Sequence, residues 1–147
     1  MSAVSDLPAR CRVAACREHR GDGQSWSFYL INDAEWPLDL AVLYEICSEW
    51  GDFGRVQTAD VRVLDLAPGA HALLWRDDGE LRSELALLIQ ARGRVLRMRF
   101  EFPRLYRQEN LSLVRGLGKP GWESAVVAAH PHSGDARQVC AVTSSGD

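Results

Sequence analysis

Residues 94–102 read RVLRMRFEF, and this stretch decides the fold class. From Leu96 to Phe102 every second side chain is apolar, and the side chains between them, from Arg97 to Glu101, are charged. Successive side chains of a β-strand point to opposite faces, so the alternation predicts a strand with one buried face and one charged face. A period of two argues against a helix in this stretch.

Six further apolar or alternating runs precede this one, at intervals of about ten residues, with Gly, Pro, Asn and Asp between them. They cover residues 11–18, 26–32, 38–48, 58–66, 70–76 and 83–91. Seven short strands predict an all-β protein, an immunoglobulin-like antiparallel β-sandwich of about seven strands. The Asn-bearing turn after residues 26–32 and the Leu66–Gly69 turn resemble the general style of bacterial immunoglobulin-like domains, which implies a fold and no function.

The run 38–48 leads to a specific expectation about its faces. Strict alternation would place Leu38, Leu40, Val42, Tyr44 and Ile46 together on the buried face of one strand.

The run near residues 77–92 has two interpretations. Asp77 and Glu80 have the spacing of a capping box, and leucines at 81, 85 and 88 followed by Gly93 also fit a helix. A strand is favoured, and Gly93 would then close a tight hairpin. The alternative is an α+β fold with one helix near residues 78–91.

The length of 147 residues fits a single domain. Residues 10–105 are predicted to form the β-sandwich, and residues 106–147 a Gly/Pro-rich C-terminal extension that is partly docked or disordered. Within the extension, Trp122 and residues 125–129 are expected to dock on the body or to form one last strand or helical turn.

Charge is unevenly distributed along the chain. The net charge is -3, but residues 33–84 hold 12 acidic and 4 basic residues, and residues 92–115 hold 7 basic and 2 acidic residues. We call residues 92–115 the basic segment. Arginine binds carboxylates and phosphates in a bidentate manner, so this segment is a candidate partner-binding surface. Its candidate residues are Arg92, Arg94, Arg97, Arg99, Arg104 and Arg107.

Two other interpretations of the basic segment remain open. Its arginines could pair across strands with Glu84, Glu101 and other acids of the same sheet, or they could protect an edge strand from aggregation. Nucleic acid is the less favoured partner, because the isoelectric point is near 5.8 and the aromatic residues Phe100 and Phe102 point inward.

An aromatic and acidic loop is the second candidate surface. Trp50 and Phe53 flank Gly51 and Asp52, and two large rings need cover from solvent. They are expected either to plug the end of the sandwich or to act as a partner-binding anchor, since Trp is enriched at binding hot spots.

The cysteines give a weaker candidate. Cys11, Cys16 and His19 could supply soft ligands to zinc, but their spacing is unusual for a zinc site. In a strand, Cys11 and Cys16 would project from opposite faces. We therefore expect two small packed thiols, no bound metal and no cofactor.

No catalytic residues are predicted, because no nucleophile or phosphate-loop pattern has the required context. The N-terminus lacks a signal-like apolar run, and the longest apolar stretch falls far short of a membrane span. We expect a cytoplasmic, non-enzymatic protein-interaction module or small subunit of a larger assembly, with a protein partner or self-association and no membrane. The alternative is a small metal-binding or redox protein that uses the Cys and His residues.

Overall fold

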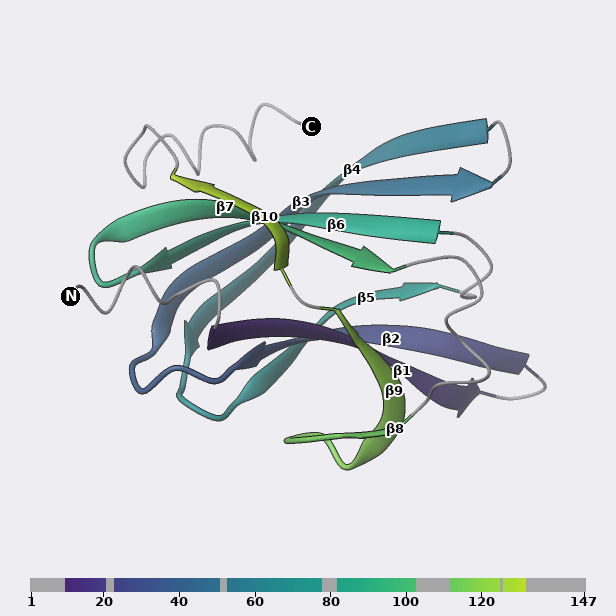
Figure 1. The fold of residues 1–147 in the computed structure, drawn as a ribbon, viewed down its shortest axis with the longest axis horizontal. Coiled ribbons are helices and arrows are strands. Elements are labelled where there is room, and N and C mark those ends of the chain that lie inside the picture. The colour runs from purple at the N-terminus through teal and green to yellow at the C-terminus, as the bar shows by residue number, and fades with distance from the viewer. Residues whose placement is uncertain are drawn as a thin grey trace.

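A computed structural model describes residues 10–20, 23–50, 53–77, 82–102, 112–124 and 126–131 of the chain. In these residues, ten strands form two five-stranded antiparallel sheets. The two sheets pack against each other with the main apolar core between them (Figure 1). The predicted all-β sandwich is therefore confirmed.

Sheet A has the strand order β5-β2-β1-β9-β8, and sheet B has the order β10-β7-β6-β3-β4. The strands are β1 (Cys11–Arg20), β2 (Gly23–Asn32), β3 (Leu38–Trp50), β4 (Phe53–Leu66), β5 (His71–Asp77), β6 (Arg82–Ala91), β7 (Arg94–Phe102), β8 (Ser112–Val114), β9 (Lys119–Ser124) and β10 (Val126–Pro131).

The first seven strands coincide with the seven predicted runs. The ambiguous region is a strand and not a helix, because β6 pairs with β3 on one side and with β7 on the other. Arg92 (φ 53°) and Gly93 (φ 78°) form the turn between β6 and β7. Positive φ at both central residues is the geometry of a tight two-residue hairpin. The immunoglobulin-like assignment stays a prediction, since sandwiches of different topologies share this architecture.

The core between the sheets is built mainly from large aromatic and aliphatic side chains of both sheets. Phe28 of sheet A meets Phe102 of sheet B edge to face, with ring centroids 4.9 Å apart. Met98 and Phe100 are also fully buried, so the alternation of RVLRMRFEF correctly predicted the inner face of β7. Burial of such side chains stabilises the fold by about 1.5–3 kcal/mol for each residue.

The structure corrects the predicted buried face of β3. The register of β3 against β6 shifts between Leu43 and Glu45, where Tyr44 is an extra residue. A β-bulge of this kind interrupts the alternation of side chains along the strand. Leu38 and Ile46 lie in the core as predicted, together with Ala41 and Leu43. Leu40, Val42 and Tyr44 instead join a separate cluster with Leu88 and Val95.

The C-terminal strands extend both sheets. β9 pairs with β1 in sheet A and β8 lies beyond it, whereas β10 pairs with β7 in sheet B (Figure 1). The sequence predicted at most one strand here, because Pro120 and Gly121 are unusual residues for a strand interior. The division of the chain at residue 105 stays a prediction, and residues 132–147 lie outside the described residues.

Gly121 allows β9 to approach β1 closely. It stands opposite Cys16 in the antiparallel register. A Cβ at this position would lie 2.6 Å from the carbonyl oxygen of Ala15, 2.9 Å from Cγ2 of Val114 and 3.1 Å from Sγ of Cys16. Since no ordinary side chain tolerates the first of these distances, only glycine fits here without a shift of the backbone.

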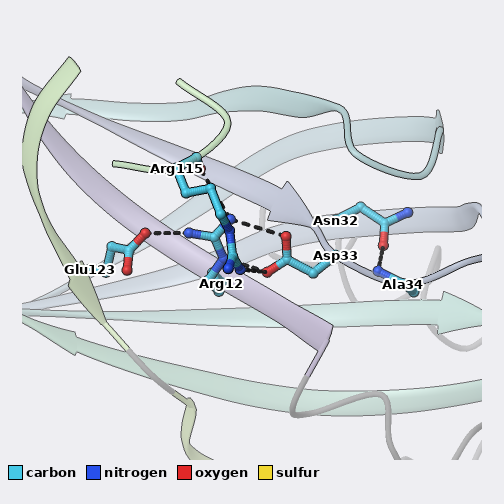
Figure 2. Close-up of polar contacts among 6 residues, drawn as sticks. All are labelled: Arg12, Asn32, Asp33, Ala34, Arg115 and Glu123. Atoms are coloured by element: carbon cyan, nitrogen blue, oxygen red, sulfur yellow. Dashed lines mark hydrogen bonds and ion pairs between the residues drawn. The ribbon is translucent and has the colours of Figure 1, made fainter. Parts of the chain in front are cut away.

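Asn32 connects the end of β2 to two neighbouring loops. Its side chain is fully buried, and its Nδ2 donates hydrogen bonds of 3.0 Å to the carbonyl oxygens of Trp36 and Leu66. Its Oδ1 accepts a 2.8 Å bond from the backbone N–H of Ala34 (Figure 2). The Gly69 N–H also donates to the Asn32 carbonyl oxygen. The loop after β2 and the turn after β4 are thus held together by one residue.

Candidate interaction surface

The turn between β6 and β7 presents the first arginine of the basic segment. Arg92 is exposed, and its guanidinium carbon lies 5.8 Å from the centre of the Trp36 ring. A guanidinium at this distance from an aromatic face is attracted by the ring quadrupole. Trp36 therefore restrains the Arg92 side chain at the tip of the hairpin.

Arg99 makes the cross-strand contact that the intramolecular interpretation predicted. Its Nη1 donates a 2.7 Å hydrogen bond to Oε1 of Glu84 on β6, and its Nη2 lies 3.7 Å from Oε1 of Glu45 on β3. The hydrogen bond to Glu84 raises the pKa of Arg99. A partly exposed pair of this kind stabilises a sheet by about 0.2–1 kcal/mol. Arg99 is therefore held within its own sheet.

Arg94 and Arg97 are both exposed on β7 but project from opposite faces of the strand, since Arg94 stands opposite the core residue Ala91 near the tip of the hairpin. Arg97 stands opposite Leu88 of β6 and opposite His130 of β10, so it lies on the face of sheet B that points away from the core. Arg104 and Arg107 lie outside the described residues. Among the described part of the predicted surface, Arg92, Arg94 and Arg97 present their side chains to solvent.

A small apolar cluster lies beside these arginines, and the sequence analysis missed it. Val42 and Leu88 are each 1% exposed, although they lie on the face of sheet B that points away from the core. Tyr44 packs against them, and its burial raises the pKa of its hydroxyl even though Arg97 and Arg99 act in the opposite direction. The bulge at Tyr44 is the feature that brings this cluster to the outer face.

Trp50 and Phe53 are opposite each other at the ends of β3 and β4. Phe53 thus belongs to a strand, and only residues 51 and 52 separate the two strands. The side chains of Trp50 and Phe53 lie outside the described residues, so plug and anchor both remain predictions.

Cys11 and Cys16 are buried in two different clusters. Cys11 packs in the core between the sheets, and Cys16 packs with Ala14 and Tyr29 in the second cluster. The structure does not bring these thiols together, and the side chain of His19 lies outside the described residues. Among the residues that are described, no three His, Cys, Asp or Glu side chains are grouped as metal ligands. The metal and redox alternative therefore receives no support from this geometry.

Cys11 is expected to resist alkylation in the native protein. Burial, and to a smaller extent the charge of Asp33, raise the pKa of the Cys11 thiol to about 12. Since the thiolate is the reactive form, iodoacetamide at pH 8 should label Cys11 about a thousandfold more slowly than a free cysteine. Peptide mapping by mass spectrometry after timed labelling checks this. The half-buried Cys47 is the internal comparison, and equal labelling of the two would contradict the prediction.

An ion-pair network around Arg12 was not predicted. The Arg12 guanidinium of β1 bonds to both Asp33 and Glu123, and its Nη2 donates a 3.1 Å bond to the carbonyl oxygen of Arg115 (Figure 2). Nη2 of Arg115 lies 3.7 Å from Asp33. Two cations face two anions, and the bond to Asp33 is the main cause of the raised pKa of Arg12.

The Arg12 network holds the β8–β9 hairpin against β1, and its charges are paired with each other and not directed to a partner. It joins β1, the loop after β2 and the β8–β9 hairpin, which are far apart in the sequence. Single charged residues at such separations carry no sequence pattern, which is why the network could not be found before the structure was known.

The chain was also compared with known proteins. No family model, no curated protein and no solved structure matches it. In the described segments, no helix is long and apolar enough to cross a bilayer. The function is therefore inferred from the charge and the geometry of the chain itself.

Proposed function

We propose that this protein acts by binding a protein partner with an acidic surface, as an interaction module or as a small subunit of a larger assembly. The observation that carries the proposal is the exposure of Arg92, Arg94 and Arg97 on one hairpin of a rigid sheet. Arg104 and Arg107, later in the basic segment, belong to the same proposed surface. The protein acts through binding and not through catalysis.

The rigidity of the hairpin favours recognition. β7 is paired on both sides, with β6 and with β10, so its side chains project from a fixed backbone. Fixed donors lose less conformational freedom on binding than donors on a loop, which favours affinity.

The charge distribution favours an acidic partner. The basic segment carries an excess of positive charge in a chain whose net charge is -3. A localised excess of positive charge steers oppositely charged partners and accelerates association, with an effect that salt screens. Binding should therefore weaken steeply as ionic strength rises.

The test reverses the charge of the exposed arginines. The variant Arg94→Glu with Arg97→Glu is expected to bind poly-glutamate at least about tenfold more weakly than the wild type, since two favourable contacts become repulsive. Fluorescence anisotropy at low and physiological salt measures the affinity, with duplex DNA as a second probe.

A matched control separates the surface from net charge. Arg10→Glu with Arg55→Glu makes the same change in net charge at two exposed residues outside the basic segment, and it should leave binding nearly unchanged. Equal weakening by both variants would refute the assignment of the surface. Tighter binding to DNA than to poly-glutamate would refute the choice of an acidic protein.

A further inference from the structure

β4 presents an unusual edge. It is the longest described strand, with 14 residues, and it stands at the end of sheet B with β3 as its neighbour there. Along its other side, within the described residues, it pairs with no strand. An edge of this length offers a row of backbone donors and acceptors to another strand, and natural proteins usually keep edge strands short.

Apolar side chains accompany this edge on both faces of the sheet. On the inner face, Ala59, Val61 and Val63 are only partly buried against the core, because no further strand covers them. On the outer face, Val56 is 67% exposed and Leu64 is 69% exposed. These are two of the four large hydrophobic side chains that are exposed in the described part of the chain. Both faces would bury apolar surface if the sheet continued.

The charges of β4 are complementary to themselves. Asp60 and Arg62 lie on the same face and form an exposed ion pair of 2.9 Å along the strand. If a second β4 lies antiparallel with Val61 opposite Val61, then Asp60 of each copy stands opposite Arg62 of the other. Opposite charges in this position stabilise a strand pair, and like charges destabilise it.

The neighbouring symmetric registers place like charges opposite each other. A shift that centres the pair on Asp60 sets two carboxylates opposite each other, and a shift that centres it on Arg62 sets two guanidinium groups opposite each other. In the register centred on Val61, Leu64 also becomes a diagonal neighbour of Val56 in the other copy, within reach of an apolar contact.

We propose that β4 pairs with β4 of a second copy of this chain, antiparallel about a two-fold axis at Val61, and joins two copies of sheet B into one continuous sheet. Such an interface uses the same patch on both copies and closes after two. It does not depend on the proposed acidic partner, because β4 lies at the opposite edge of sheet B from β7 and β10. Charges can also protect an edge from pairing, and so can the register shift of β4 against β3 between Thr58 and Val61. The experiment decides between these outcomes.

The experiment uses two single charge reversals. Sedimentation equilibrium of the wild type should give twice the chain mass of 16.4 kDa at micromolar concentration. Asp60→Arg places four positive charges at the centre of the interface, and Arg62→Asp places four negative charges there. Each variant should raise the dissociation constant of the dimer by at least about tenfold. Both positions are about 40% exposed, so the fold should tolerate the change.

Mixing the two variants gives the decisive result. In the proposed register, position 60 of each copy faces position 62 of the other. In the mixed dimer the two reversed side chains therefore face each other with opposite signs, as do the two unreversed ones, so the heterodimer should be about as stable as the wild-type dimer. Native mass spectrometry identifies it. Controls with the same charge changes outside β4 are Asp39→Arg and Arg10→Asp, both at exposed residues, which should dimerise as the wild type does. A monomeric wild type, dimeric single variants or a mixture that stays monomeric would each overturn the proposal.

Discussion

Asn32→Asp is expected to destabilise the protein by about 3 kcal/mol at pH 7, because it leaves one buried and one partly buried carbonyl group without their donor. The substitution keeps the shape of the side chain and the acceptor for Ala34. It replaces the Nδ2 that bonds to Trp36 and Leu66 by an oxygen that repels both. For a chain of this size, the melting temperature should fall by roughly 6–12 °C, as measured by calorimetry.

The pH dependence distinguishes this mechanism from simple loss of packing. Burial and the two carbonyl oxygens should raise the pKa of the introduced carboxyl in the folded state above its unfolded value of about 3.9. The folded variant then binds more protons than the unfolded one, so its stability should recover as pH falls toward 4 and be lost as pH rises. Asn32→Ala should be destabilised without this recovery. Gln90→Glu, the same chemical change on β6, should leave the melting temperature nearly unchanged.

Gly121→Ala is expected to displace β9 from β1. Since the new Cβ would lie 2.6 Å from the Ala15 carbonyl oxygen, the two strands must separate or the backbone must shift. Overpacking of this kind costs about 1–3 kcal/mol. The loss should be concentrated in residues 112–124, because the Arg12 network and the β1–β9 pairing hold that hairpin to the body.

Hydrogen exchange measured by mass spectrometry checks the location of this effect. The amides of β9 and of Val13 to Cys16 should exchange faster in Gly121→Ala than in the wild type, while β6 and β7 stay protected. Gly54→Ala is the matched control, since it lies in a strand and a Cβ there would meet no atom within 4 Å. Equal protection of β9 in wild type and Gly121→Ala would show that the backbone accommodates the methyl group without cost.

Periodicity predicted the seven strands of the body because each buries one face. RVLRMRFEF is the clearest example, since its inner side chains from Met98 to Phe102 are fully buried. The predicted face of β3 was right for Leu38 and Ile46 but wrong for Leu40, Val42 and Tyr44. The bulge at Tyr44 depends on pairing with β4 and β6, which no local pattern encodes. β8 and β9 were missed because β9 is held by its pairing with β1 and β8 by its pairing with β9, and not by apolar alternation.

The candidate surface was predictable in composition and not in detail. Clustered arginines are visible in the sequence, and cross-strand pairing such as that of Arg99 with Glu84 was one of the three interpretations that it allowed. The position of Arg92 over Trp36, the buried Asn32 and the Arg12 network required the structure, because each joins residues from separate segments. The self-complementary charges of β4 became visible only once that strand was known to be an edge.

The pairing of β1 with β9 also has a consequence for synthesis of the chain. β2 follows β1 almost at once, but β9 begins about 100 residues later, which a ribosome adds in roughly 5–20 s. During that interval one side of β1 has no strand to pair with, and its backbone groups are open to chaperones or to other nascent chains. Any substitution that delays the docking of β9, such as Gly121→Ala, should therefore reduce the yield of folded protein in cells more than its melting temperature suggests.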